Sequence, residues 1–123
     1  MVRKRILLVE DSELNHDLLT QILEDEYDVR VASDGEEGVR KAVAERPDLV
    51  LMDLALPLLD DWWEATRQIK STEGLRQIPV IAITSHAMVG EERRAREAGC
   101  DDYLSKPIDE RLLVDKIGRW VKS

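Results

Sequence analysis

The sequence predicts one α/β domain, a doubly wound sheet of five parallel strands with helices on both faces. Three observations favour this class. Five short apolar runs alternate with five segments of helical periodicity, a pattern typical of βα units and of a parallel sheet. The chain has 123 residues, the size of one domain, so we expect residues 1–123 to form a single unit. The hydrophobic content of 43% is sufficient for a buried core.

The first βα unit is predicted near the N-terminus. The continuous apolar run at residues 6–9 predicts a strand that is buried on both faces. Ser12 is a preferred helix N-cap. The apolar residues that follow it share one helical face: Leu14, Leu18, Leu19, Ile22 and Leu23.

The next two units repeat the pattern. Residues 29–32 predict a second strand and residues 33–35 a turn, and the helix that follows carries Val39, Ala42 and Val43. Residues 49–52 predict a third strand. The helix after it has an apolar face formed by Trp62 or Trp63, Ala65, Thr66 and Ile69.

The last two units follow a polar, glycine-containing loop at residues 71–77. The fourth strand is predicted at residues 80–83, and the helix at residues 88–98 is charged, has only alanines inside and ends at Gly99. A short fifth strand at residues 103–104 precedes a helix that begins after Pro107. Its apolar face consists of Ile108, Leu112, Leu113, Ile117 and Val121.

Composition excludes several classes of protein. The chain has 18 Lys and Arg residues against 26 Asp and Glu residues, a formal net charge of -8, which argues against direct binding to nucleic acid. Its single cysteine, Cys100, allows neither an intrachain disulfide nor a cysteine zinc site. Apolar runs are too short for a membrane span or a signal peptide. We therefore expect a cytoplasmic protein that binds neither nucleic acid nor membrane.

Polar side chains follow the strands, at the point where each strand ends. Glu10 and Asp11 follow the first strand, Asp53 the third, Thr84 the fourth and Lys106 the fifth. In a doubly wound sheet, ligands bind beyond the carboxyl ends of the strands, at the point where the strand order reverses. The sequence therefore predicts a site at this edge of the sheet.

The grouping of the acidic residues favours one strand order. In the order 3-2-1-4-5, Asp53 would lie two strands away from Glu10 and Asp11, whereas in the order 2-1-3-4-5 the three carboxylates converge. Three convergent carboxylates repel one another unless a cation lies among them, and their oxygen ligands suit Mg²⁺ or another hard divalent ion such as Mn²⁺. Lys106 would supply a further positive charge.

These residue types suit phosphoryl transfer. A metal ion and Lys106 would neutralise the equatorial oxygens of the moving phosphoryl group, and Thr84 could donate a hydrogen bond to one of them. Asp53 could be the nucleophile, which would form an aspartyl phosphate.

With these residues the chain resembles a known family, the response-regulator receiver domains of two-component signalling. The resemblance covers essentially the whole chain. It rests on segments that follow one another in order and lie at strand ends: residues 6–11, 51–53 with Leu56 and Pro57, 83–84 and 102–107. It implies the flavodoxin-like strand order 2-1-3-4-5, which is known for the chemotaxis receiver of this family.

The resemblance also implies roles. Asp53 would be the phosphoacceptor, paired with Lys106, and the Lys106-Pro107 peptide bond would be cis. Thr84 and Tyr103 would form a switch that changes the surface of the fourth helix, fifth strand and fifth helix, where a downstream protein target binds. The phosphodonor would be a phosphohistidine on a histidine kinase or a histidine phosphotransfer protein. The metal would be held by Glu10, Asp11, Asp53 and the backbone carbonyl of Ala55.

The sequence departs from the family pattern at residues 60–63, where Asp61 stands near the position of a usual glycine and two tryptophans follow. Two side chains are expected to set the lifetime of the phosphoryl group on Asp53. Ala55 cannot orient a hydrolytic water, so the phosphoryl group is expected to persist. His86 could offset this effect if it positions a water. We also expect His16 to be solvated.

Three alternatives remain. A pseudo-receiver scaffold would act through protein contacts without phosphorylation. A haloacid-dehalogenase-type phosphatase needs an Asp where Ala55 stands, and a flavodoxin-like electron carrier would place its flavin phosphate among Glu10, Asp11 and Glu13.

Overall fold

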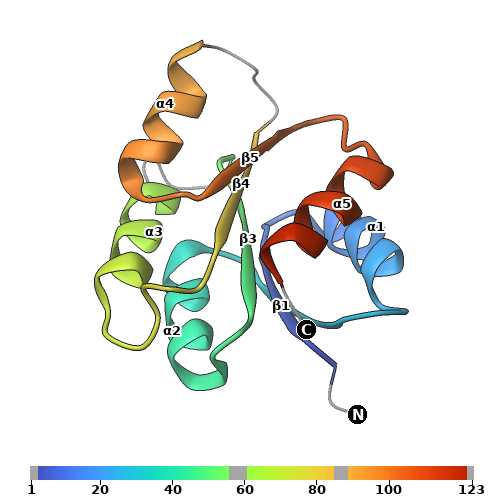
Figure 1. The fold of residues 1–123 in the computed structure, drawn as a ribbon, viewed down its shortest axis with the longest axis horizontal. Coiled ribbons are helices and arrows are strands. Elements are labelled where there is room, and N and C mark those ends of the chain that lie inside the picture. The colour runs from blue at the N-terminus through green and yellow to red at the C-terminus, as the bar shows by residue number, and fades with distance from the viewer. Residues whose placement is uncertain (1–2, 56–60, 85–88, 122–123) are drawn as a thin grey trace.

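The computed structural model describes residues 3–55, 61–84 and 89–121, and the ten expected elements lie within them (Figure 1). The strands are β1 (Arg5–Val9), β2 (Asp28–Ala32), β3 (Leu49–Asp53), β4 (Val80–Thr84) and β5 (Asp102–Ser105). The helices are α1 (Glu13–Leu23), α2 (Gly35–Glu45), α3 (Asp61–Ser71), α4 (Val89–Ala98) and α5 (Glu110–Trp120).

The five strands form one parallel sheet in the order β2-β1-β3-β4-β5, which confirms the predicted order. In the register, Val9 of β1 lies beside Met52 of β3, and Asp53 lies beside Ile83 of β4. The carboxyl ends of β1 and β3 are therefore neighbours, and β4 lies next to β3 on the other side.

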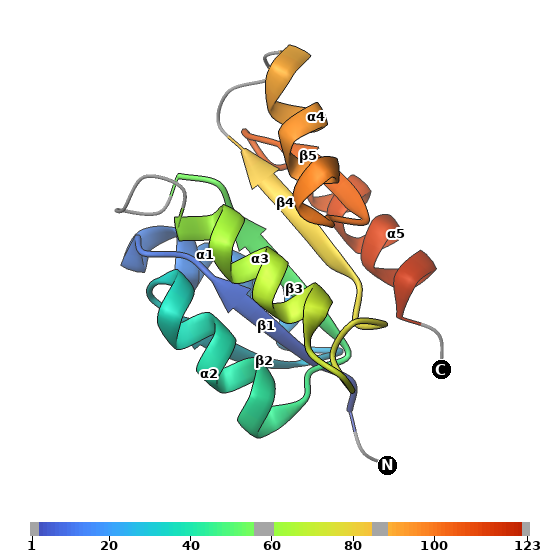
Figure 2. The same cartoon turned by 90° about the vertical axis from the view of Figure 1, so that its left-hand side faces the viewer.

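The sheet separates two hydrophobic cores. Helices α2, α3 and α4 cover one face, and α1 and α5 cover the other (Figures 1 and 2). Alternate residues of one strand point into opposite cores. Leu7 and Val9 of β1 pack toward α2, α3 and α4, and Ile6 and Leu8 pack toward α1 and α5. This is the physical reason for the continuous apolar runs in the sequence.

The expected apolar face of α1 is only partly buried. Leu19 and Leu23 are almost fully buried, but Leu14 is 78% and Leu18 is 53% exposed. Leu18 and Leu19 are consecutive, so they lie about 100° apart around the helix, and the apolar surface is wider than the strip that contacts the sheet. The predicted apolar stripe is therefore wider than the buried part of α1, and Leu14 and Leu18 remain in contact with water.

The start of α1 and the end of α4 follow the sequence signals, whereas α5 begins at Glu110 after the N-cap Asp109, so Ile108 precedes the helix. Ser12 caps α1 as predicted, because its hydroxyl accepts a hydrogen bond from the Asn15 N–H at 3.4 Å. Gly99 follows α4 with φ of 115°, a left-handed conformation that favours glycine. A Cβ atom at Gly99 would also lie 2.9 Å from Cγ of Lys70.

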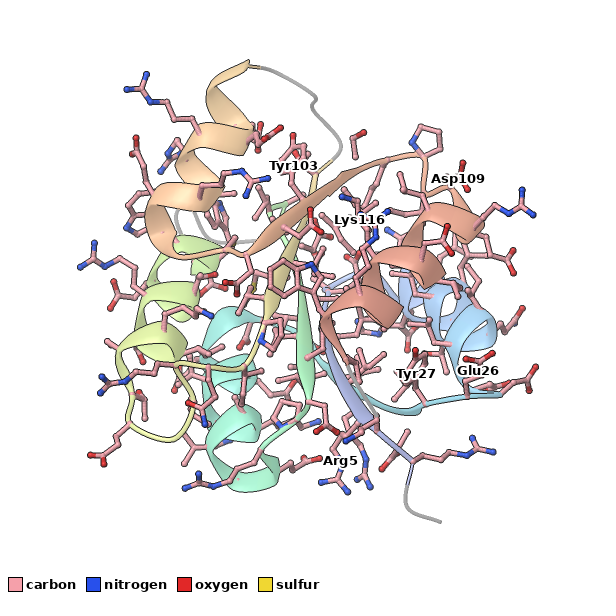
Figure 3. All side chains as sticks on the ribbon, viewed as in Figure 1. Arg5, Glu26, Tyr27, Tyr103, Asp109 and Lys116 are labelled. Carbon is pink, nitrogen blue, oxygen red and sulfur yellow. The ribbon has the colours of Figure 1, made fainter. Side chains whose placement is uncertain are left out.

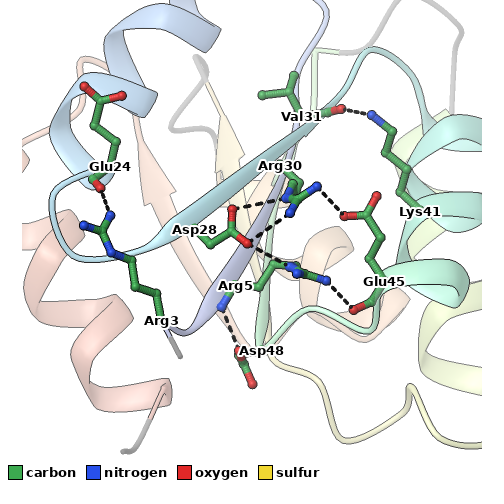
Figure 4. A network of polar contacts seen from close by, with 9 residues as sticks. All are labelled: Arg3, Arg5, Glu24, Asp28, Arg30, Val31, Lys41, Glu45 and Asp48. Carbon is green, nitrogen blue, oxygen red and sulfur yellow. Dashed lines mark hydrogen bonds and ion pairs between the residues drawn. The ribbon is translucent and has the colours of Figure 1, made fainter. Parts of the chain in front are cut away.

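An ion-pair network secures the edge strand β2 at the end of the sheet opposite Asp53 (Figure 4). Asp28 of β2 accepts hydrogen bonds from Nε of Arg30 at 3.1 Å and from Nε of Arg5 at 3.2 Å. The hydrogen bond from Arg30 is the main cause that holds the pKa of Asp28 below its usual value. A further pair joins Arg30 to Glu45 of α2 at 3.7 Å. In the part of the chain that the structure describes, no helix is both long enough and apolar enough to cross a membrane.

Candidate functional site

The predicted site residues lie together at the carboxyl edge of the sheet. Asp53 is the last residue of β3 and Thr84 the last residue of β4, while Glu10 follows β1 directly. Lys106 follows β5. Each side chain is thus positioned by the end of a strand, which restricts its movement more than a loop would.

Three carboxylates form the centre of this cluster. Glu10, Asp11 and Asp53 each offer an oxygen atom, and these atoms lie within 4.8 Å of one another. Glu10 and Asp53 are each only 1% exposed, and Asp11 is exposed. Such a set of oxygen ligands, with one side open to water, fits a hard divalent cation that keeps several water ligands.

Lys106 faces the two buried carboxylates. Its Nζ atom lies 3.2 Å from Oδ2 of Asp53 and 3.5 Å from Oε1 of Glu10. Burial lowers the pKa of Lys106, but the charges of Asp53 and Glu10 outweigh that effect, so the net shift is upward. Lys106 is therefore a permanent cation at neutral pH, placed within reach of the Asp53 carboxylate.

The backbone around Lys106 is also defined. The Lys106-Pro107 peptide bond is cis, as the resemblance implied. The Lys106 N–H donates a hydrogen bond to the Thr84 carbonyl at 2.7 Å. This bond continues the pairing of β5 with β4 by one residue and carries the Lys106 side chain back over the edge of the sheet.

Glu10 has an unusual protonation equilibrium. Burial raises its pKa to about 7, and the hydrogen bond with Asp53 and the charge of Asp53 act in the same direction. The Ser12 N–H, 3.2 Å from Oε2 of Glu10, and the charge of Lys106 act in the opposite direction. Near neutral pH, Glu10 is therefore partly protonated and hydrogen-bonded to Asp53, and a metal ion bound here would displace that proton.

The two carboxylate oxygens of Asp53 have different partners. Its Oδ1 atom accepts a hydrogen bond from the Ala55 N–H at 2.9 Å, and Oδ2 faces Lys106. Ala55 itself is exposed. The Ala55 N–H orients the carboxylate.

Thr84 and Tyr103 are in contact. Thr84 is 1% exposed, and a hydrogen bond joins its side chain to that of Tyr103 on β5, the strand between α4 and α5 (Figure 3). Burial raises the pKa of Tyr103, and the charges of Glu91 and Glu92 on α4 raise it further. The structure thus links the site to α4 through two side chains.

Two contacts were missed by sequence reasoning. His16 is half-buried, and its Nε2 atom contacts the main-chain oxygen of Glu10, so the expectation of a solvated His16 was wrong. The place of His16 in the sequence could have predicted this contact, because His16 lies one helical turn beyond Ser12 and close to Glu10 and Asp11. Asp61, which departs from the family pattern in the sequence, is the first residue of α3, and its Oδ2 atom accepts a hydrogen bond from the Gly35 N–H at 2.8 Å.

Other positions singled out in the sequence lie outside the described residues. These are the tuning residue His86, together with Leu56, Pro57 and Asp60.

Comparisons with known proteins agree with the fold and identify the family. The sequence model of the response regulator receiver domain matches residues 6–118. The polar-differentiation response regulator DivK of Brucella anthropi is 41% identical over 119 residues, which cover 96% of each chain.

Solved structures show the same fold. The receiver domain of the sensor histidine kinase PA1611 from Pseudomonas aeruginosa has a TM-score of 0.90 and 38% identity over 99% of this chain and 100% of that one, and its structure has a magnesium ion coordinated in the active site cleft. The receiver domain of Saccharomyces cerevisiae Ssk1, crystallised with the histidine phosphotransfer protein Ypd1, has a TM-score of 0.87 and 29% identity over 98% of this chain and 90% of that one.

Proposed function

The chain belongs to the response regulator receiver domain family of two-component signalling, and from that premise we propose that it is a phosphorylation-dependent switch or phosphorelay module whose phosphoacceptor is Asp53. Receiver domains are signalling domains rather than classical enzymes, so the chemistry proposed is limited to the chain's own phosphorylation and dephosphorylation. The observation that carries the proposal is the placement of Lys106 Nζ 3.2 Å from a buried Asp53 carboxylate, beside two further carboxylates.

The transfer step uses atoms already in position. An Asp53 oxygen attacks phosphorus as the bond from phosphorus to the donor's imidazole nitrogen breaks, and the imidazole leaves with the electron pair. Lys106 neutralises charge on the transferred group, and the Thr84 hydroxyl donates a hydrogen bond to one of its oxygens. The Ala55 N–H holds the carboxylate during the attack.

The same residues fit a divalent cation. Glu10, Asp11 and Asp53, with the carbonyl of Ala55, would hold Mg²⁺ or Mn²⁺. The cation supplies positive charge to the phosphoryl oxygens during transfer. Support comes from the chemistry of the three oxygen donors and from the magnesium ion in the related PA1611 receiver structure.

The signal would leave the site through Thr84 and Tyr103. When the Thr84 hydroxyl turns toward a phosphoryl group, its hydrogen bond with Tyr103 has to break or rearrange. Tyr103 then changes its position against α4, and the surface formed by α4, β5 and α5 changes for a downstream protein target.

The phosphodonor in this proposal is a phosphohistidine on a histidine kinase or a histidine phosphotransfer protein, in the cytoplasm. The pairing of Ssk1 with Ypd1 in a related crystal structure supports this class of partner. Leu14 and Leu18, the exposed leucines of α1, lie within two turns of the acidic pair and offer an apolar surface beside the site.

Leu18→Ser tests this surface. We expect it to slow transfer from a phosphorylated histidine protein by about tenfold, because apolar contact area in the encounter is lost, and to leave labelling by acetyl phosphate unchanged. The measurement is phosphotransfer from the histidine kinases and phosphotransfer proteins of the source organism. Val43→Ser is the matched control, since Val43 is also half exposed but lies on α2. Equal rates for both variants would remove α1 from the docking surface.

The central test is incubation with acetyl phosphate and Mg²⁺, read by intact mass. We expect the wild-type protein to gain one phosphoryl group and Asp53→Asn to gain none, because the amide is not a nucleophile of comparable strength. Asp48→Asn is the control, as Asp48 lies at the opposite edge of the sheet. An unlabelled wild-type protein, under conditions that label another receiver, would favour the pseudo-receiver scaffold.

Ala55 and His86 remain proposed tuning positions. We expect Ala55→Asn to shorten the half-life of the phosphoryl group severalfold, because an amide can orient the hydrolytic water, and His86→Ala to lengthen it. Mass spectrometry after removal of acetyl phosphate measures the decay. Unchanged decay in both variants would contradict the hypothesis.

A further inference from the structure

The two tryptophans at the start of α3 form a packed pair that the proposed chemistry does not use. Trp62 is 5% exposed within the core, and Trp63 is partly buried against the same core. Their ring centroids lie 5.6 Å apart with an interplanar angle of 73°, an edge-to-face arrangement.

Arg94 of α4 lies over both rings. Its guanidinium carbon is 5.5 Å from the ring centroid of Trp62 and 5.2 Å from that of Trp63. Distances below about 6 Å allow a cation–π attraction, for which tryptophan is the best partner. Arg94 therefore joins α4 to α3 at the position where the sequence departs from the family pattern.

The tryptophan pair is attached to the body of the domain. Asp61, which precedes it, accepts a hydrogen bond from the Gly35 N–H at the start of α2. Ile69, farther along α3, is fully buried. These contacts hold α3 at both ends, so a change at the Arg94 contact would move α4 rather than α3.

Helix α4 has a small buried face. Of its described side chains, only those of Ala95 and Ala98 are buried. Its charged residues pair along the helix itself, Arg93 with Glu97 at 3.3 Å and Arg96 with Glu92 at 3.2 Å, and such pairs stabilise the helix without attaching it to the sheet. Together with the buried Ala95 and Ala98, the contact of Arg94 with the tryptophans therefore attaches α4 to the rest of the domain.

We propose that Arg94 and the Trp62–Trp63 pair form a latch that holds α4 in the arrangement of the unphosphorylated protein. The strength of this latch sets how readily α4 shifts when Asp53 is phosphorylated. The latch rests on the proposed phosphoacceptor function. Its geometric basis is the position of α4 between the tryptophans and Tyr103, since Tyr103 packs against the same core as Trp63 and bonds to Thr84.

The latch makes a thermodynamic prediction. If it stabilises one of two arrangements, its removal lowers the cost of reaching the other, and any ligand that binds the second arrangement better gains apparent affinity by the same factor. Beryllofluoride with Mg²⁺ is a suitable probe, because BeF₃⁻ bound to a carboxylate resembles an acyl phosphate. Arg94→Ala is expected to bind it about two- to fivefold more tightly than wild type, the range of an exposed cation–π contact.

The experiment compares Arg94→Ala with Arg93→Ala. Both remove an arginine from the same helix, but Arg93 contacts Glu97 within α4, whereas Arg94 contacts the tryptophans of α3. Calorimetric titration with beryllofluoride measures affinity, and hydrogen exchange of the α4 amides without ligand measures attachment. We expect tighter binding and faster exchange for Arg94→Ala only. If either readout is the same for the two variants, the latch is overturned.

Two further results make the test specific. Trp63→Leu should change both readouts in the same direction as Arg94→Ala but by a smaller amount, because Arg94 also lies over Trp62. The double variant should differ little from Arg94→Ala, because without Arg94 the substitution at Trp63 removes no further part of this contact; additive effects would also overturn the latch. A wild-type protein that does not bind beryllofluoride would contradict the phosphoacceptor function itself. If the wild-type protein binds beryllofluoride but Arg94→Ala behaves as Arg93→Ala, only the latch is contradicted. The two outcomes are therefore distinguishable.

Discussion

Lys106→Met is expected to slow the labelling of Asp53 by acetyl phosphate by roughly 10²–10³-fold, the usual cost of removing one group that stabilises charge in a transition state. Lys106 Nζ lies 3.2 Å from Oδ2 of Asp53, where negative charge is transferred with the phosphoryl group. Methionine keeps the length and apolar stem of the side chain but supplies no positive charge. Intact mass spectrometry over time measures the rate.

The same substitution is expected to lower the free energy of unfolding by roughly 2 kcal/mol at pH 8. That is less than the 3–5 kcal/mol typical of a fully buried pair, because the Lys106 side chain is 22% exposed and Glu10 can take up a proton. The loss should be smaller at pH 6, where Glu10 is protonated and fewer negative charges remain unpaired. Urea unfolding at both pH values measures it.

Lys116→Met is the matched control for both measurements. Lys116 pairs with Asp102 at 2.8 Å, and its side chain is 18% exposed, close to the value for Lys106. It lies on α5, outside the acidic cluster, so the labelling rate should stay unchanged. Equal labelling rates for the two variants would show that the position of Lys106 beside Asp53 has no chemical role.

Saturation with Mg²⁺ is expected to raise the free energy of unfolding by about 2.7 kcal/mol when the ion is present at 100 times its dissociation constant. For a chain of this size, each kcal/mol corresponds to roughly 3–5 °C in Tm, so the expected shift is roughly 10 °C. The cause is the proximity of Glu10, Asp11 and Asp53, whose mutual repulsion the cation removes. Differential scanning calorimetry with MgCl₂ and with EDTA measures the shift.

The stabilisation by Mg²⁺ should depend on pH. The pKa of Glu10 is raised from 4.5 to about 7, so between these values the folded protein binds more protons than the unfolded chain. Without metal, this group makes the protein less stable as pH rises from about 4.5 to about 7, and the effect is constant above that. Mg²⁺ competes with the proton, so its effect on Tm should be larger at pH 8 than at pH 6.

Other shifted carboxylates do not interfere with this test. The pKa values of Asp28 and Asp102 lie below the usual 3.8, so the stability that they contribute is lost only in more acidic solution. Glu10→Gln should remove most of the difference between pH 6 and pH 8 while keeping the fold. A Tm that does not respond to Mg²⁺ at either pH would contradict the proposed metal site.

Much of the fold could be predicted because parallel sheets have a simple signature. A strand buried on both faces needs consecutive apolar residues, and the runs at residues 6–9, 49–52 and 80–83 lie within β1, β3 and β4. The predicted strand order was confirmed, and the convergence of Glu10 and Asp53 follows from it. Asp61 was harder to interpret, because its partner is the Gly35 N–H, 26 residues earlier in the chain.

Exposure could not be predicted where a helix has more apolar surface than the sheet can cover. Leu14 and Leu18 follow the same periodicity as Leu19 and Leu23, yet only the latter two are buried. The periodicity of the sequence shows which residues of α1 are apolar, but not which of them are buried. The angle at which α1 lies on the sheet decides which of them lose contact with water.

The sequence by itself determined which chemical groups meet at the site, because polar residues at the ends of parallel strands converge at one edge of the sheet. Only the tertiary structure decided their electrostatics. The pKa of Glu10 near 7 depends mainly on burial, and the raised pKa of Lys106 depends on the charges of Asp53 and Glu10, which lie 53 and 96 residues away in the chain. It also decided that Arg94 lies over Trp62 and Trp63. Burial and Coulomb energy depend on distances in space, which a local pattern of residues does not contain.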